Sequence, residues 1–419
     1  MLKQYLTILI LVLALFISCK NDKEKENPIS EEEQELVVLF DNPSEENSQL
    51  PRLFSTGKEL YFSWITTVDE VDKLNYAVLN NGVWTATSEI AQGKDWFTNW
   101  ADFPAIAENN GNILSSYLQK SDTATYAYDI KLNLFNSEEK RWKKDLILHD
   151  DNTKTEHGFV SMLPFEDRDF FVTWLDGRNT GGGHDDHDHS AGGGAMTLRG
   201  GFVKNDGTVY NELQLDERIC DCCNTGAAMT RNGPIVVYRD RSEDEVRDIS
   251  IVRFDDHVWT APQTVSKDNW EIAGCPVNGP AVDAFGNNVA VAWYTAAKDK
   301  PKVQLIFSED GGASFGLPIR VDSNDTSGRV DVAIISDNEA VISWIETIGD
   351  NTVIQLLKVG SNGSKGDVVT LTTTSASRSS GFPQIEILDG FVYAAWTVVT
   401  NDDSAQKTIE TARLRLDAF

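Results

Sequence analysis

Arginines and tryptophans recur at matching places along this chain, beside the ends of apolar segments. The planar, permanently charged fork of arginine suits a carboxylate or sulfate group, and an indole face stacks on a sugar ring. The sequence therefore predicts a binding site for an acidic glycan or another anionic ligand. The candidate ligand-binding residues are Arg52, Arg178, Arg239, Arg241, Arg329, Arg378, Trp100 and Trp270.

Carboxylates, tyrosines and one histidine fall near these arginines in the sequence pattern. Such groups act as nucleophiles or as general acids and bases in enzymes. A second interpretation needs no ligand, because arginines that pair with Asp176, Asp240 or Asp248 would brace neighbouring loops. The candidate catalytic residues are Asp176, Tyr238, Asp240, Tyr294, Glu346 and His157.

Four cysteines occur in two short segments in the middle of the chain. Exported chains favour disulfides, and the preferred pairing joins Cys275 to one of the other three. The alternative is a thiolate site for copper(I) or zinc, although the spacing fits no standard pair of zinc ligands. The disulfide candidates are Cys220, Cys222, Cys223 and Cys275.

A glycine-flanked tract of histidines and aspartates covers residues 181–194. Such a tract can bind transition metals weakly. It can equally be a flexible loop of biased composition, because no rigid element fixes the ligand geometry. Its candidate metal ligands are His184, His187 and His189, and the sequence indicates no other cofactor.

Seven repeats of one pattern organise the chain around these residues. Each repeat has a short strand, often opened by proline, and then an alternating apolar strand that ends in an aromatic residue. A spacing of about 50 to 60 residues is typical of the four-stranded blades of a β-propeller. The repeated aromatic residues are Trp64, Tyr117, Trp174, Tyr238, Trp293, Trp344 and Trp396.

We therefore predict an all-β, seven-bladed propeller, with six blades and an irregular hairpin as the alternative. The last repeat shows only three strands, so residues 35–40 are expected to supply its fourth strand and close the ring. In an antiparallel blade the start of the inner strand and the end of the second strand lie at one face. The candidate residues should therefore converge at one mouth of the central channel.

The segment from Ser308 to Phe315 follows the Asp-box pattern of serine, aspartate, glycine, serine and aromatic residue. It resembles the turns of the sialidase-like (BNR/Asp-box) propellers, where it is structural. The resemblance implies an exo-sialidase-like glycoside hydrolase, with three arginines on a carboxylate, a glutamate-activated tyrosine and an aspartate acid. Arg52 lies in the first inner strand, as one sialidase arginine does, but sialidases have six blades.

A mouth with arginine, histidine and tyrosine also resembles that of some lyases that act on uronate-containing polysaccharides. There a tyrosine or histidine removes the proton α to a carboxylate, and His157 would serve. A third alternative is a non-catalytic propeller that binds a glycan, a protein partner or a metal. The sequence leaves these three functions open.

The first residues resemble the export signal of a bacterial lipoprotein. An apolar run too short to span a membrane ends at Ser18-Cys19. We expect a signal peptide over residues 1–18, lipidation of Cys19, a charged tether over 19–34 and one propeller domain over 35–419. This predicts an outer-membrane lipoprotein at the cell surface or facing the periplasm; the alternative is an ordinary secretory peptide.

The net charge of the chain indicates which partners it is suited to bind. The chain has 65 acidic and 37 basic residues, for a net charge of −28. An acidic protein is poorly suited to phosphate backbones, so we expect no nucleic-acid partner. Hydrophobic residues make up 41% of the chain, enough for a large core, and we expect a monomer.

Overall fold

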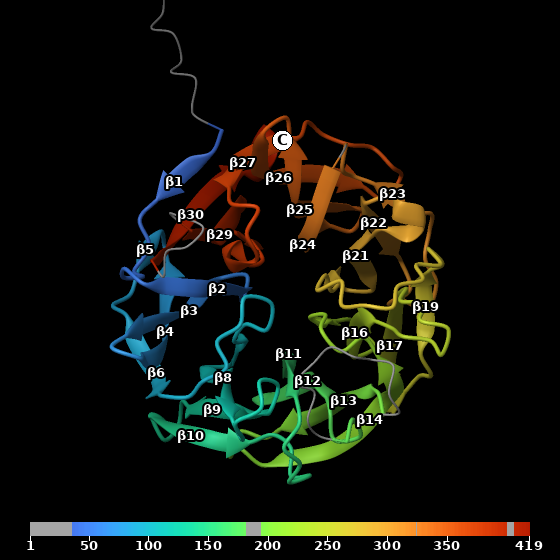
Figure 1. Cartoon of the computed structure of the whole chain (residues 1–419). Coiled ribbons are helices and arrows are strands. Elements are labelled where there is room, and N and C mark those ends of the chain that lie inside the picture. The colour runs from blue at the N-terminus through green and yellow to red at the C-terminus, as the bar shows by residue number, and fades with distance from the viewer. Residues whose placement is uncertain (1–35, 182–193, 324, 400–405) are drawn as a thin grey trace, which may run out of the picture. The chain divides into compact units, whose positions relative to one another are not determined.

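The computed structural model describes residues 36–181, 194–323, 325–399 and 406–419. The compact unit Val37–Phe419 consists of seven antiparallel sheets of four or five strands. The sheets follow one another around a ring, from blue to red in Figure 1. This confirms the seven-bladed propeller and excludes six blades. Among the described residues, no helix is long and apolar enough to cross a membrane.

The first four blades take their strands in chain order from the channel outward. Blade one contains β2 (Ser48–Ser55), β3 (Leu60–Val68), β4 (Val71–Asn80), β5 (Val83–Trp84) and β6 (Ser88–Gly93). Blade two contains β7 (Ile106–Asn109), β8 (Asn112–Lys120), β9 (Tyr128–Asn136) and β10 (Arg141–Ile147). Blade three contains β11 (His157–Phe165), β12 (Asp169–Asp176), β13 (Met196–Val203) and β14 (Val209–Ile219). Blade four contains β15 (Gly226–Met229), β16 (Pro234–Arg239), β17 (Ile249–Asp255), β18 (Val258–Trp259) and β19 (Gln263–Ser266).

The last three blades complete the ring, together with three short 3-10 helices. Blade five contains β20 (Ala281–Phe285), β21 (Asn288–Thr295), β22 (Lys302–Ser308) and β23 (Ile319–Arg320). Blade six contains β24 (Asp325–Ser336), β25 (Glu339–Ile348), β26 (Asn351–Gly360) and β27 (Val369–Thr374). Blade seven contains β28 (Gln384–Leu388), β29 (Phe391–Val399), β30 (Lys407–Arg415) and β1 (Val38–Phe40). The helices are η1 (Ala297–Asp299), η2 (Arg378–Ser380) and η3 (Leu416–Ala418).

The N-terminal strand closes the ring, as the sequence predicts. β1 pairs antiparallel with β30, with Val38 opposite Arg413, and the two lie side by side in Figure 1. The Thr411 hydroxyl also donates to the Phe40 carbonyl oxygen at 2.7 Å. Because β1 covers the outer edge of β30, blade seven gains a fourth strand from the opposite end of the chain.

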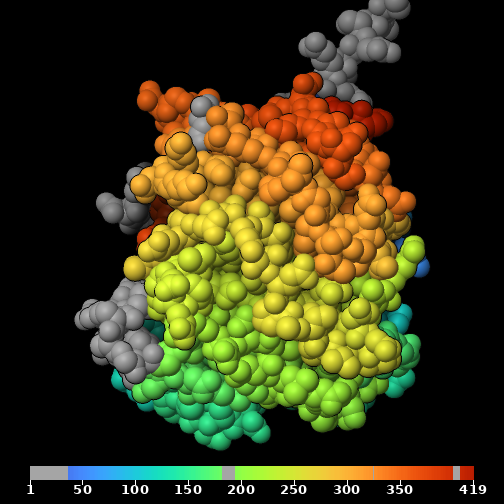
Figure 2. Space-filling view, turned by 90° about the vertical axis from the view of Figure 1, so that its right-hand side faces the viewer, coloured from blue at the N-terminus to red at the C-terminus, as the bar shows by residue number. Residues whose placement is uncertain are grey.

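The hydrophobic core lies between the blades. Seven apolar clusters each join two neighbouring sheets, and in Figure 2 the green, yellow and orange blades pack side by side. The repeated aromatic residue of each blade belongs to the cluster shared with the preceding blade. For example, Trp174 of blade three packs with Tyr128 and Leu132 of blade two. Each aromatic ring thus fixes its blade against the preceding one.

The polar atoms of these buried rings have partners in six of the seven blades. Trp174 Nε1 donates to Asp176 at 2.9 Å, and Trp344 Nε1 donates to Glu346 at 3.0 Å. Trp396 Nε1 has no hydrogen-bond partner among the described residues. A buried donor usually needs an acceptor, so the residue two positions after the tryptophan often supplies it.

The turn from Ser308 to Phe315 has the structural role that its pattern predicts. Ser314 N donates to Asp310 Oδ1 at 2.8 Å, and the Ser314 hydroxyl donates to Asp310 Oδ2 at 2.6 Å. Gly311 and Gly312 both have positive φ angles, which glycine adopts without steric cost. The aspartate therefore holds a turn and does not face the channel.

Replacing Trp344 by phenylalanine should destabilise the propeller more than the same change at Trp396. Both changes shrink a buried ring, but only the first leaves the buried Glu346 carboxylate without its indole donor. The difference in unfolding free energy should be about 1–3 kcal/mol. Urea unfolding of the two variants measures it, and equal losses would show that the indole hydrogen bond contributes nothing.

Candidate functional site

A pocket of about 300 Å³ lies at the face of the ring where the inner strands begin. Its wall comes from the loops that lead into blades two, three, four, five and seven and from the start of β9. Inner-strand starts of five blades therefore converge at one mouth of the channel, as predicted, whereas the lining of this pocket includes no second-strand end. We call this the mouth pocket. Its polar and reactive side chains include Tyr126, Tyr128, Glu156, Cys222, Cys275 and Arg378.

Tyr128 and Glu156 line the mouth pocket, and the buried carboxyl group of Asp102 lies next to Tyr128. The Tyr128 hydroxyl donates to Glu156 Oε1 at 2.6 Å and lies 3.5 Å from Asp102 Oδ2. Burial raises the pKa of Asp102 to about 7. Burial and the negative charge of Asp102 hold the pKa of Glu156 well above its ordinary value. Both carboxyl groups therefore bind protons more tightly than ordinary carboxyl groups, which suits them to general acid–base catalysis.

Tyr126 and Arg378 form the more open part of the same pocket. Tyr126 is half-buried; burial and the negative charge of Glu156 raise its pKa, whereas the positive charge of Arg378 lowers it. Arg378 is exposed, and its guanidinium group makes no hydrogen bond or ion pair with any residue that the structure describes. A cation without a protein partner is available to an anionic ligand.

Two of the other predicted arginines are buried and bound by the protein. Arg239 is 2% exposed and Arg329 is 7% exposed. Both guanidinium groups donate mainly to backbone carbonyl oxygens. Arg239 lies over the ring of Trp270 at 4.9 Å, and Arg329 lies over Trp100 at 5.0 Å. These contacts cover one face of each predicted stacking tryptophan.

Arg178 and Arg241 are paired with carboxylates. Arg178 Nε donates to Asp176 Oδ1 at 2.7 Å, and Arg241 makes a bidentate contact with Glu245 and a second ion pair with Asp221. The Arg178–Asp176 pair is one that the loop-bracing alternative predicts, whereas Arg241 forms its ion pairs with other carboxylates than that alternative names.

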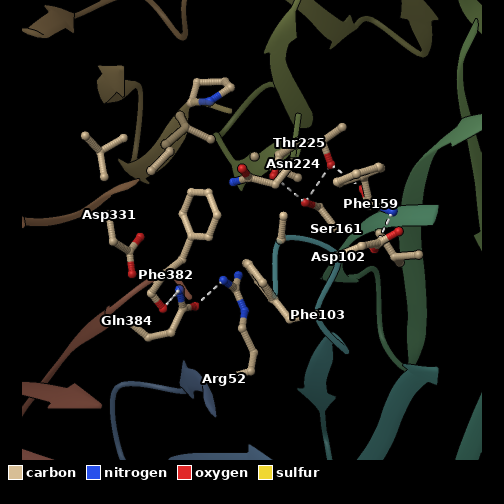
Figure 3. Close-up of a pocket in the computed structure, with 18 residues that line it drawn as sticks. Arg52, Asp102, Phe103, Phe159, Ser161, Asn224, Thr225, Asp331, Phe382 and Gln384 are labelled. Atoms are coloured by element: carbon tan, nitrogen blue, oxygen red, sulfur yellow. Dashed lines mark hydrogen bonds between the residues drawn. The ribbon is translucent and has the colours of Figure 1, made fainter. Parts of the chain in front are cut away.

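Arg52 lies in the channel below the mouth. Arg52 NH1 donates to Gln384 Oε1 at 2.5 Å, and its guanidinium carbon lies 5.7 Å from the centroid of the Phe103 ring. Figure 3 shows this group pointing at Gln384, with Phe382 beside it. The channel space here is about 50 Å³, which suits a few water molecules and is too small for a sugar ring.

None of the six predicted catalytic residues lines the mouth pocket. Asp176 and Glu346 are buried, and each accepts a hydrogen bond from the indole N–H of a buried tryptophan. The Tyr238 hydroxyl donates to Asp216 at 2.5 Å, and Asp240 accepts a hydrogen bond from Ser250. The remaining tyrosine, Tyr294, packs edge-on against Trp270, with the ring centroids 5.6 Å apart.

His157 belongs to a separate buried cluster. Its ring stacks on His149 with centroids 3.8 Å apart, and its Nε2 lies 3.1 Å from Asp151 Oδ2. It is fully buried and does not line the mouth pocket. Asp151, His157 and Asp176 bring one potential ligand atom each to within 4.8 Å of one another.

The predicted disulfide is absent, because no disulfide joins any of the four cysteines that the structure describes. Cys220 Sγ lies 3.5 Å from Cys223 Sγ and 3.9 Å from Cys222 Sγ, whereas a disulfide needs about 2.05 Å. Cys275 and Cys222 both line the mouth pocket. Cys19, His184, His187 and His189 lie outside the described residues, so their roles stay predictions.

The pocket residues Tyr126, Tyr128 and Glu156 are not among those predicted from the sequence. The predicted residues come from inner-strand starts and second-strand ends, but third-strand starts reach the same face, and Tyr128 begins the third strand of blade two. Glu156 directly precedes β11, at an inner-strand start. The strand pattern alone would have singled out these positions.

No known protein-family model matches the chain, and no curated protein matches its sequence. An ulvan lyase of polysaccharide lyase family PL25, solved bound to -[GlcA(1-4)Rha3S]-, matches with TM-score 0.58 and 11% identity over 90% of this chain and 96% of its own. A protein of unknown function from Dyadobacter fermentans matches with TM-score 0.51 and 11% identity over 77% and 96%. NanB sialidase from Streptococcus pneumoniae gives TM-score 0.46 and 8% identity over 91% and 94%. At 11% identity the first two matches show a shared propeller fold.

Proposed function

We propose that this chain is a glycan-active propeller that cleaves a uronate-containing polysaccharide by β-elimination in the mouth pocket. The observation that carries the proposal is the unpaired Arg378 beside a pocket that also holds Glu156 and Tyr126. The cation can hold a uronate carboxylate. The carboxyl group and the phenol can move the two protons that the reaction requires.

Each group has one role in the proposed reaction. Arg378 binds the uronate carboxylate and stabilises the negative charge that develops next to it. Glu156, as a carboxylate, accepts the proton α to that group, and Tyr126 donates a proton to the departing glycosidic oxygen. The C–O bond breaks, its electrons leave with that oxygen, and a C=C bond forms from the C–H electrons. No water is consumed.

Other features support the glycan assignment. The mouth pocket, at about 300 Å³, is at the lower end of the size range of small-molecule sites, and Trp100 and Phe97 add aromatic surface to it. The propeller that matches with TM-score 0.58 is a lyase bound to a saccharide that contains glucuronate. A shared fold does not determine function, so the side chains of this pocket carry the assignment.

One observation favours hydrolysis as a second candidate. Tyr128 and Glu156 share a hydrogen bond of 2.6 Å. The resemblance to sialidases implies a pair of this type, in which a glutamate activates a tyrosine nucleophile. Tyr128 is completely buried, however. The resemblance to sialidases also implies three arginines that hold the carboxylate of the ligand, whereas among the described arginines predicted for the site only Arg378 has no protein partner. Elimination therefore fits the geometry better.

Lipidation of Cys19 remains part of the proposal. A lipid-anchored propeller outside the cytoplasm would meet polysaccharide before import. Loss of membrane association in the Cys19→Ala variant would support this placement.

Incubation of the chain with uronate-rich polysaccharide should give unsaturated products without added water, as measured by mass spectrometry. Glu156→Gln and Tyr126→Phe should each lower kcat by about 10²–10⁴-fold. Arg378→Ala should lower kcat/KM, whereas Arg415→Ala, a change of an exposed arginine at the end of β30, should not change it. Products that gain water would instead establish the hydrolase, and activity that survives Glu156→Gln would refute this assignment of the base.

The pH dependence should follow the shifted pKa values. Glu156 acts as a carboxylate and its pKa is raised, so kcat/KM should rise with pH through values well above 4.5. Tyr126 acts as a phenol and its pKa is also raised, so activity should be lost only above about pH 10. A profile of initial rates tests this, and a maximum at acidic pH would contradict the two roles.

A further inference from the structure

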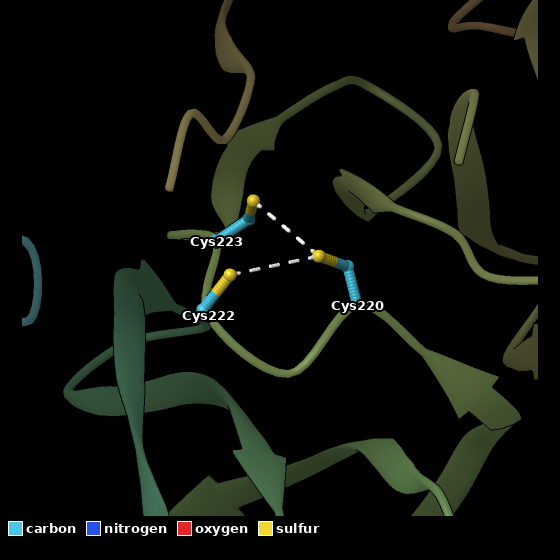
Figure 4. A group of neighbouring side chains, drawn as sticks. All are labelled: Cys220, Cys222 and Cys223. Carbon is cyan, nitrogen blue, oxygen red and sulfur yellow. Dashed lines mark hydrogen bonds between the residues drawn. The ribbon is translucent and has the colours of Figure 1, made fainter. Parts of the chain in front are cut away.

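Three cysteine sulfurs gather beside the mouth pocket without forming a disulfide. Cys220, Cys222 and Cys223 lie on the loop between β14 and β15, and Figure 4 shows their sulfurs pointing toward one another. All three sulfurs lie within 4.8 Å of one another. We call this group the sulfur cluster. The proposed reaction does not use it.

The separations fit a shared ion. Two sulfurs bound at about 2.3 Å to one tetrahedral metal ion lie about 3.8 Å apart. Cys220 Sγ is 3.5 Å from Cys223 Sγ and 3.9 Å from Cys222 Sγ. The sulfurs therefore need only small movements to bind one ion.

The surroundings stabilise a thiolate at Cys220. Arg247 is fully buried, and its NH1 donates to Cys220 Sγ at 3.2 Å. Asn278 N also donates to Cys223 Sγ at 3.4 Å. Thiolates are the form that binds metal ions, and such donors orient them.

A buried positive charge near the sulfur cluster can balance the negative charge of thiolates that bind a metal ion. The guanidinium group of Arg239 donates to backbone carbonyl oxygens and has no carboxylate partner among the described residues. Its positive charge is therefore available to balance negatively charged sulfur. Arg247, by contrast, is paired with Glu245. A divalent ion on three thiolates leaves one net negative charge, which Arg239 can offset.

The cluster is also accessible from solvent. Cys222 and Cys275 line the mouth pocket, whereas Cys220 and Cys223 lie beneath them and are buried. An ion can therefore reach the cluster through the pocket and be held in a mostly buried site. The loop is fixed at both ends, because Cys220 N donates to the Arg239 carbonyl oxygen and Gly279 N donates to Asn224 Oδ1.

We propose that Cys220, Cys222 and Cys223 bind one thiophilic d¹⁰ metal ion, zinc(II) or copper(I). Thiolate ligands select these ions over hard cations such as magnesium or calcium. The site is adjacent to the catalytic residues proposed above but does not depend on their roles.

The test is metal titration of the full-length chain under reducing, oxygen-free conditions. Zinc(II) and copper(I) are added separately, each against a chromophoric chelator, and magnesium(II) serves as the control ion. One equivalent of zinc(II) or copper(I) should bind and protect Cys220, Cys222 and Cys223 from alkylation, mapped by peptide mass spectrometry. Binding of only one of the two ions identifies the metal. Unprotected thiols with both ions, or a disulfide among these residues in the chain as isolated, would overturn the proposal.

Variants locate the ligands. Cys220→Ser and Cys223→Ser should each weaken the affinity by more than about 100-fold, whereas Cys275→Ser should retain one equivalent. Near-ultraviolet circular dichroism checks that each variant is folded. If a variant is not folded, the thiols that metal protects from alkylation in the wild-type chain identify the ligands. Unchanged affinity in both folded ligand variants, or loss of binding only in Cys275→Ser, would contradict the three-sulfur site.

Discussion

Aromatic packing between neighbouring blades is the constraint on which this propeller depends. The second strand of each blade carries a tryptophan or tyrosine that is at most 6% exposed and packs against the preceding blade. Seven such contacts and the β1–β30 pairing close the ring. Because the aromatic rings carry N–H or O–H groups, their burial also demands nearby acceptors.

Two of the candidate catalytic residues serve as such acceptors. Asp176 and Glu346 lie where the sequence places them, at the ends of second strands, but they accept hydrogen bonds from Trp174 and Trp344. The arginines show the same pattern. A guanidinium such as that of Arg239 is as well satisfied by carbonyl oxygens of neighbouring blades as by a ligand.

The groups left for chemistry lie where loops from several blades meet. Glu156 and Tyr126 come from loops that enter different strands, and Arg378 comes from the short helix before the last inner strand. The sulfur cluster reaches the same pocket through Cys222. Catalytic and metal-binding proposals thus concern adjacent regions of one mouth, each with its own set of side chains.

The seven blades, the closing N-terminal strand and the face at which loops converge could be predicted from the sequence. Those features follow from strand periodicity and aromatic spacing, which are local along the chain. The side chains that remain available for a ligand could not be predicted in the same way. Whether Arg378 or Arg329 has a partner, and whether Cys275 bridges Cys222, depends on distances between residues far apart in the sequence. Burial and hydrogen bonding across blades set those distances, and no local pattern encodes them.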